Sequence, residues 1–111
     1  MQFTISDDTG TTAKIGLAGK LDIAGAEVIA LPLATLAGAK KGVVVDLSAV
    51  TFLSSIGIRH LVSATKTLSR KGGKLVLLNP PASVKEVLET SGVTDIMPIV
   101  TTESAAYELI G

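Results

Sequence analysis

Apolar and polar residues alternate along the first 21 residues of the chain. Phe3 and Ile5 have polar neighbours, and the alternation resumes from Ile15 to Leu21. Between these stretches, residues 7–10 read Asp-Asp-Thr-Gly, residue types that favour a turn. Period-two alternation interrupted by a turn is typical of two antiparallel strands. The first 21 residues are therefore predicted to form a β-hairpin.

A helix is predicted directly after the hairpin. Asp22 suits its N-cap, because an aspartate carboxylate accepts hydrogen bonds from the free amides of the first turn. The helix is expected to run toward Gly38. Pro32 lies inside it, and proline lacks a backbone N–H and clashes with the preceding turn. We therefore expect a kink or a split at Pro32.

Two short runs, residues 42–47 and 75–78, are almost entirely apolar and leave no polar side for water. The first is rich in β-branched valine, and such runs are typical of strands that are covered on both faces. A helix lies between them in the chain, and a crossover of this kind makes a parallel pair. We predict that the two runs are adjacent, parallel and buried strands.

The segment between these two strands is predicted to be a connection over residues 48–55 and then a helix that ends at Gly72 and Gly73. Apolar residues recur there at helical spacing, and polar residues take the opposite face. The inward residues are expected to be Ile58, Leu61, Val62 and Leu68, and the outward ones Arg59, His60, Ser63, Lys66 and Arg70.

The last third of the chain is predicted to add two helices and one strand. Residues 79–81, Asn-Pro-Pro, open a helix that Gly92 closes, with Val84, Val87 and Leu88 inward. Residues 96–100 form a short strand, and Thr101 or Thr102 caps a terminal helix. The chain is thus expected to be one α/β domain, residues 1–111, with a mixed sheet of about five strands and about four helices.

Composition excludes several classes of function. Ten basic residues balance ten acidic ones and only 3% of residues are aromatic, which argues against general nucleic-acid binding. With no cysteine and His60 as the only histidine, we expect no metal site, no cofactor and no catalytic triad. No stretch of about 20 apolar residues is present, and the N-terminus lacks the pattern of a signal peptide. We expect a cytoplasmic protein without membrane insertion and without enzymatic activity.

Charged residues are unevenly distributed along the chain. No acidic residue occurs between Asp46 and Glu86, a segment that holds Arg59, Lys66, Arg70, Lys71 and Lys74. After Lys85 every charged residue is acidic. One side of the fold is therefore predicted to be basic and another acidic, either as a binding face or as an ordinary solvated helix face.

Two serines precede the predicted second helix. Ser54 or Ser55 suits its N-cap, and Gly57 permits close packing of the first turn. A helix N-terminus also stabilises a phosphate group through its free amides and its dipole. This position therefore suits a regulatory phosphate as well as a structural cap.

Four segments together resemble the STAS domain of anti-sigma factor antagonists. They are Gly19-Lys20-Leu21-Asp22, the valine-rich strand ending in Asp46-Leu47-Ser48, Phe52-Leu53-Ser54-Ser55-Ile56-Gly57-Ile58-Arg59, and Gly73-Lys74-Leu75-Val76-Leu77 before Asn79-Pro80. The resemblance covers nearly the whole chain. It implies a STAS-type fold and a non-enzymatic switch that binds an anti-sigma factor with a serine-kinase-like fold and so releases a sigma factor. A serine phosphatase would reverse the modification.

The motif that is phosphorylated in this family reads Asp-Ser-Ser-Gly or Asp-Ser-Thr-Gly, with the modified hydroxyl directly before glycine. Here the corresponding residues are Ser54, Ser55, Ile56 and Gly57, so the acceptor position holds an isoleucine. Either Ser55 or Ser54 substitutes as the phosphorylated residue, or the protein binds its partner constitutively. We favour constitutive binding, because a serine one position away points its oxygen in another direction.

The expected partner-binding residues follow from the resemblance together with the exposed side of the second helix. They are Asp22, Ser54, Ser55, Ile56, Gly57, Arg59, His60, Ser63 and Lys66. The alternative is a scaffold role, in which the same domain is a subunit of a sensory assembly or of a transporter. The proteins that co-purify with the chain distinguish these two hypotheses.

Overall fold

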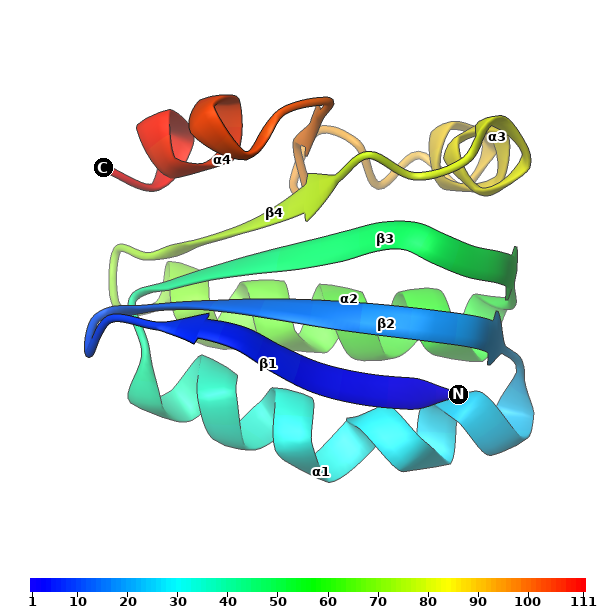
Figure 1. The fold of residues 1–111 in the computed structure, drawn as a ribbon, viewed down its shortest axis with the longest axis horizontal. Coiled ribbons are helices and arrows are strands. Elements are labelled where there is room, and N and C mark those ends of the chain that lie inside the picture. Colours follow the sequence, from blue (N-terminus) through cyan, green and yellow to red (C-terminus); the bar gives the residue numbers. More distant parts are fainter.

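A five-stranded mixed sheet crosses the molecule in the order β1-β2-β3-β4-β5 (Figure 1). The computed structural model describes residues 1–111. The strands are β1 (Gln2–Asp8), β2 (Thr12–Leu21), β3 (Gly42–Leu53), β4 (Lys74–Leu78) and β5 (Ile99–Val100). Strands β1 and β2 form an antiparallel hairpin, and every later pair is parallel. The predicted hairpin, mixed sheet and α/β class are confirmed.

Four helices cover the two faces of the sheet unequally. They are α1 (Ile23–Ala39), α2 (Ser55–Ser69), α3 (Ala82–Thr90) and α4 (Glu103–Ile110). Helices α1, α2 and α3 contribute to the larger core, on one face, whereas α4 packs on a small core of Val44, Val76 and Leu78 on the other. Side chains of α4 also reach β1 and β2, through the Lys14–Glu103 ion pair and the hydrogen bond from Tyr107 to Asp7.

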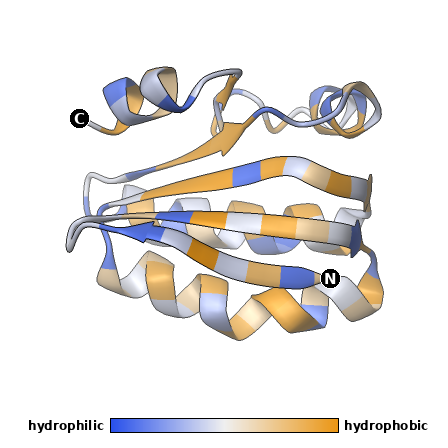
Figure 2. Ribbon diagram, in the orientation of Figure 1, coloured by the Kyte–Doolittle hydropathy of each residue, from blue (hydrophilic) through white to orange (hydrophobic).

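Strands β3 and β4 form the buried centre of the sheet. Val43 pairs with Leu75 and Val45 with Leu77 in a parallel register, and all four side chains are fully buried. Figure 2 shows these strands as the most apolar part of the sheet. The prediction that residues 42–47 and 75–78 are adjacent, parallel and covered on both faces is confirmed.

Strand β3 is longer than predicted, because residues 48–53 continue it where a connection was expected. In its pairing with β2, the register shifts between Gly16 and Ala18 and again between Gly19 and Lys20. At each shift β3 contains one extra residue, which disturbs the alternation of inward and outward side chains. The resulting spacing of buried residues, Leu47, Val50 and Leu53, is three, which is not the period-two signature of a strand.

Three further expectations were wrong in detail. Of the kink or split expected at Pro32, the split is wrong, because α1 runs without interruption through this residue. The carbonyl of Val28 loses its usual donor at Pro32, and Val28 itself is half-exposed. Val87 is exposed on α3, where only Val84 and Leu88 are buried. The strand expected over residues 96–100 is limited to Ile99–Val100.

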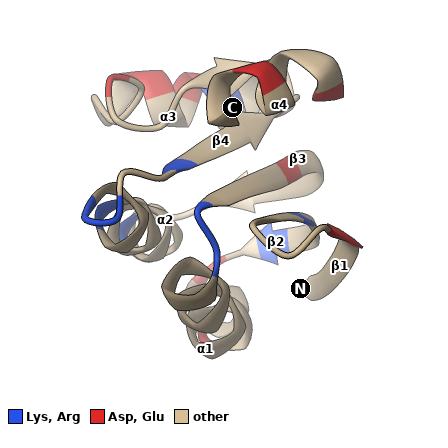
Figure 3. Ribbon diagram, turned by 90° about the vertical axis from the view of Figure 1, so that its left-hand side faces the viewer, with Lys and Arg blue, Asp and Glu red and all other residues tan.

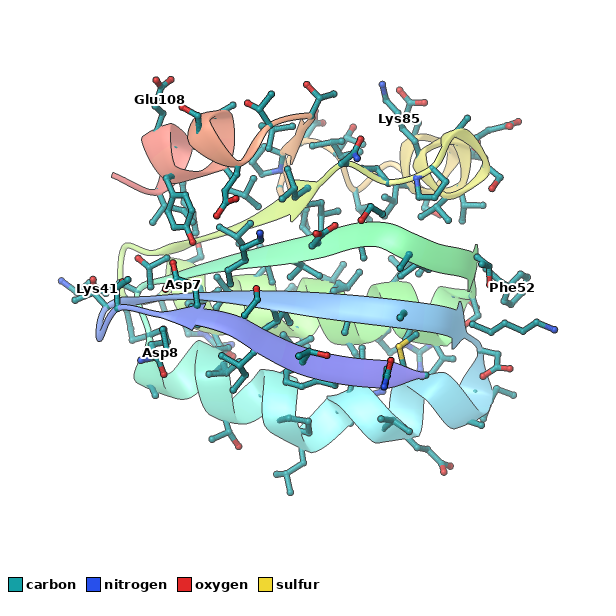
Figure 4. All side chains as sticks on the ribbon, viewed as in Figure 1. Asp7, Asp8, Lys41, Phe52, Lys85 and Glu108 are labelled. Atoms are coloured by element: carbon teal, nitrogen blue, oxygen red, sulfur yellow. The ribbon has the colours of Figure 1, made fainter.

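The hairpin tip is held to the rest of the molecule by side chains from α4 and from the end of α1. The Lys40 ammonium pairs with Asp8, which lowers the pKa of that carboxyl, and the Gly10 amide adds to the effect. The Tyr107 hydroxyl donates to Asp7 across 3.1 Å. Partial burial, followed by this hydrogen bond, raises the pKa of Tyr107. Figure 4 places Asp7 and Asp8 at the same end of the sheet as Lys41.

Candidate partner-binding surface

Two helix N-termini lie side by side at the edge where β2 and β3 end. Leu21 and Leu53 are partners in the parallel ladder, and the chain leaves each of them into a helix. Asp22 is the N-cap of α1 and Ser54 is the N-cap of α2, as the sequence predicted. Since parallel strands deliver their helices at the same edge, both helix dipoles direct their positive ends to this surface.

The two caps are fixed by short hydrogen bonds. The Asp22 carboxylate accepts from the Gly25 amide at 2.8 Å. The Ser54 hydroxyl donates to the Leu21 carbonyl at 2.7 Å and accepts from the Gly57 amide at 3.3 Å, and the Ser54 amide also donates to Leu21, at 3.0 Å. The Ser54 hydroxyl therefore acts both as donor and as acceptor in holding the start of α2 against the end of β2.

Two glycines allow this close packing. A Cβ atom at Gly57 would lie 2.6 Å from Cγ of the buried Leu21, and one at Gly25 would lie 2.2 Å from the Lys20 carbonyl oxygen. Neither position therefore accommodates a side chain without movement. Gly57, which we expected among the partner-binding residues, is itself buried and supports the edge from beneath.

Ser55 and Ile56 follow the Ser54 cap in different environments. Ser55 is exposed at the first position of α2, and its hydroxyl makes no hydrogen bond to the protein. Ile56, at the position directly before glycine, is half-buried. The free hydroxyl of this edge therefore belongs to Ser55.

An exposed stripe continues from Ser55 along the outer side of α2. Arg59, Ser63 and Lys66 are exposed, and they follow one another at spacings of four and three residues, so they share one face. His60 is half-buried on its flank, less open than expected. At a rise of 1.5 Å per residue, the stripe from Ser55 to Lys66 is about 16 Å long.

Helix α2 has no acidic residue, and neither ion pair of the structure involves it. Lys66, near its C-terminal end, belongs to a wider basic region, whereas α3, α4 and the segment between them are mostly acidic (Figure 3). The basic region, at the end of the sheet where β3 and β4 begin, contains Lys40, Lys41, Lys66, Arg70, Lys71 and Lys74; the acidic residues are Glu86, Glu89, Asp95, Glu103 and Glu108. The predicted separation of charge is present.

Two exposed apolar residues beside the caps were not predicted. Ile23, directly after Asp22, is 72% exposed, and Phe52, two residues before Ser54, is 50% exposed. Figure 4 shows Phe52 at the end of the sheet opposite to Lys41. Phe52 points outward because of the second register shift in β3, which the sequence pattern does not reveal. Ile23 was identifiable, since a residue that follows an N-cap starts the helix on its exposed side.

None of the helices is both long enough and apolar enough to cross a membrane.

Comparisons with known proteins agree with this geometry. Residues 5–106 match the family described as "STAS domain". BtrV of Bordetella bronchiseptica is 34% identical over 91 residues, 81% of this chain and 78% of that protein. The anti-sigma F factor antagonist of Lysinibacillus sphaericus is 28% identical over 113 residues, covering all of this chain and 97% of the relative.

Solved structures of the anti-sigma factor antagonist SpoIIAA have the same fold. The unphosphorylated form superposes with a TM-score of 0.83 at 27% identity, covering 97% of this chain and 96% of that one. The phosphorylated form, from Bacillus, gives 0.75 at 26% identity, covering 97% and 99%. The family match spans more than nine tenths of the chain, and the strand order, the two helix caps and the long coverage of the relatives agree with it. This chain belongs to the STAS domain family.

Proposed function

We propose that this chain is an anti-sigma factor antagonist, which binds an anti-sigma factor and thereby releases a sigma factor. The observation that carries the proposal is the edge where the Asp22 and Ser54 caps adjoin and continue into the exposed stripe of α2. The Lysinibacillus protein and SpoIIAA, both named as antagonists, support it. The chain acts by binding and not by catalysis, and its partner has a serine-kinase-like fold.

The stripe of α2 suits a partner surface that is acidic. Arg59 and Lys66 are exposed and have no carboxylate partner within the molecule, so their charges are available. Complementary charge across an interface accelerates association and excludes wrong partners. Ile23 and Phe52 supply apolar contact area beside the two caps. Asp22, Ser54, Ser55, Ile56, Arg59, His60, Ser63 and Lys66 form the proposed contact surface, with Gly57 beneath it.

Ser54 is a poor phosphate acceptor in this fold. Its hydroxyl proton is donated to the Leu21 carbonyl, and its oxygen caps the Gly57 amide. Phosphorylation would remove that donor and place a dianion against a carbonyl oxygen. Ser55 has a free hydroxyl and is the remaining candidate.

We propose that the antagonist binds constitutively, because Ile56 occupies the acceptor position and has no hydroxyl. Neighbouring residues of a helix differ by about 100° around its axis, so Ser55 directs its oxygen away from the direction that residue 56 takes. A phosphoryl transfer requires the hydroxyl in line with the γ-phosphate of ATP. If Ser55 is nevertheless modified, a serine phosphatase is the enzyme that restores binding.

The binding proposal is tested with the purified complex of the cognate anti-sigma and sigma factors. Addition of the wild-type chain should release the sigma factor, as measured by size-exclusion chromatography. Arg59→Glu and Lys66→Glu should each weaken binding by about 1–3 kcal/mol without affecting folding, because the residues are exposed. Lys85→Glu is the matched control, since Lys85 is an exposed lysine on α3, outside the proposed surface (Figure 4).

Unchanged affinity of both α2 variants, measured by calorimetry, would locate the interface elsewhere. A wild-type chain that leaves the sigma factor bound would refute the function itself. In a pull-down from the native cells, recovery of an ATPase of the kinase-like class supports the proposal. Recovery of sensory-assembly or transporter subunits in its place would indicate the scaffold role.

The switch proposal is tested by intact-mass analysis after incubation with the kinase and ATP. The wild-type chain should keep its mass, whereas Ile56→Ser should gain one phosphate and lose affinity for the partner. The added charge, about −1.5 to −2, would lie at the docking edge near Asp22. A phosphate on the wild-type chain that Ser55→Ala abolishes would overturn constitutive binding and leave the binding function intact.

A further inference from the structure

Helix α1 has two apolar faces, of which only one is covered. The inner face packs in the core through Ala26, Ile29, Leu33, Leu36 and Ala37. The opposite face exposes Ala24, Val28, Leu31 and Thr35, which we call the outer stripe. Leu31 is 75% exposed and Val28 is 47% exposed. A helix on the surface of a monomer ordinarily has a polar outer side, so this one has the composition of a covered helix.

The outer stripe is also nearly free of polar groups. Glu27 is the only charged residue among the 17 residues of α1. The hydroxyl of Thr35 donates to the Leu31 carbonyl at 2.9 Å, so its hydrogen-bond donor is satisfied within the helix. Figure 2 shows apolar residues around most of α1, with few hydrophilic ones. A partner that packs on the outer stripe would therefore contact it through apolar side chains and would need no charged groups to complement it.

The spacing of the outer stripe fits another helix. Its four residues follow one another at intervals of four, three and four, which is the alternation of a and d positions in a coiled-coil seam. Valine at an a position and leucine at a d position are common in two-stranded seams. The stripe therefore matches the side of a second α-helix better than it matches a strand or an extended peptide.

The outer stripe is complementary to the outer stripe of a second copy that is related by a two-fold axis perpendicular to the helix. In an antiparallel pair centred between Ile29 and Ala30, Val28 packs against Leu31 of the second copy, and Ala24 packs against Thr35 of the second copy. The larger side chains then meet at the centre and the smaller ones at the ends. We propose that the outer stripe is a two-fold interface between two copies of this chain.

The size of this surface predicts a weak dimer. Helix α1 is about 25 Å long and about 10 Å wide. The neighbouring edge strand β1, which lies along α1 in Figure 1, extends the surface with the half-exposed Ile5. The helix presents about 250 Å² per copy and β1 adds to it, so two copies together bury less than about 1,000 Å², at the low end for specific interfaces. We therefore expect a weak dimer that dissociates on dilution.

This pairing does not use α2, although Ala24 at one end of the outer stripe adjoins Asp22 and Ile23 of the proposed anti-sigma factor surface. Sedimentation velocity of the full chain from about 5 μM to 1 mM tests it. The wild-type chain should change from monomer to dimer over this range. Val28→Glu and Leu31→Lys should each weaken association at least tenfold and keep the fold, as measured by circular dichroism. Ile96→Glu and Ile96→Lys are matched controls, because Ile96 is 48% exposed, far from α1 in the chain.

Mixing the two single variants tests the antiparallel pairing itself. A heterodimer joins the Val28→Glu position of one chain to the Leu31→Lys position of the other at one of the two central layers, and it retains the native pair at the other. The mixture of Val28→Glu and Leu31→Lys should therefore dimerise more strongly than either variant alone. A monomer at all concentrations, a dimer unaffected by both substitutions, or a mixture that fails to associate would overturn the proposal.

Discussion

Replacing Gly57 by alanine tests whether the partner-binding edge depends on close packing over Leu21. The new Cβ atom would lie 2.6 Å from Cγ and 2.8 Å from Cδ2 of Leu21, a side chain that is fully buried and has no solvent to move into. Overpacking of this kind costs about 1–3 kcal/mol. The higher helix propensity of alanine returns up to about 1 kcal/mol. The net expectation is a loss of about 1–2 kcal/mol.

Urea denaturation followed by circular dichroism measures this loss at a protein concentration of a few micromolar, at the lower end of the range over which self-association is tested. Gly38→Ala is the matched control, since Gly38 is an exposed helical glycine and a Cβ there meets nothing within 4 Å. It should stabilise the protein by about 0.5–1 kcal/mol. The same substitution is thus expected to have opposite signs at the two sites.

A double-mutant cycle then assigns the loss to Leu21. In the background of Leu21→Ala, which removes Cγ and both methyl groups, Gly57→Ala should become neutral or stabilising. Because the Ser54 cap is bonded to the Leu21 carbonyl, Gly57→Ala should also weaken binding to the anti-sigma factor. A Gly57→Ala protein as stable as the wild type, or a cycle without coupling, would refute the packing argument.

Three further predictions concern the core and the supports of the fold. Val44→Asp places an unpaired carboxylate in the small core beneath α4 and should lower the unfolding free energy by several kcal/mol, about the whole stability of such a domain. A soluble, cooperatively folded variant would contradict the burial of the Val44 side chain. Because the pKa of Tyr107 is raised in the folded protein, its contribution to the unfolding free energy is present below the unfolded pKa near 10 and is lost as the pH rises through the folded pKa. Tyr107→Phe should abolish this loss of unfolding free energy in denaturation experiments at alkaline pH. An unchanged pH dependence in the variant would contradict the prediction. The Lys71 ammonium donates to three carbonyls at the end of α1, those of Ala37, Gly38 and Lys40. Lys71→Met should therefore lower the unfolding free energy by about 1 kcal/mol in urea titrations. An unchanged urea midpoint would show that water replaces these hydrogen bonds.

The elements that sequence predicts well are those whose signals are local. Val43, Val44 and Val45 form a continuous apolar run, and a strand that shows no polar side has to be covered on both faces. The caps at Asp22 and Ser54 are equally local, because each side chain bonds an amide three residues ahead. These predictions needed no knowledge of the rest of the fold.

The features that sequence missed depend on contacts between distant segments. The register shifts that extend β3 to Leu53 arise from its pairing with β2, and they break the alternation on which strand prediction relies. Helix α1 continues through Pro32 because Ile29 and Leu33, on either side of it, are buried in the core and hold the helix together. In both cases tertiary packing outweighs the local preference.

The partner-binding edge combines both kinds of information. Its residue types are visible in the sequence, but their proximity depends on the pairing of Leu21 with Leu53, which are far apart in the chain. That pairing brings the Leu21 carbonyl within reach of Ser54, while the side chain of Leu21 fills the space beneath Gly57. A displacement of Leu21 therefore moves the start of α2 and, through Asp22, the start of α1. Because the two helix N-termini share this one support, a substitution or a phosphate at either of them is expected to affect the whole binding edge.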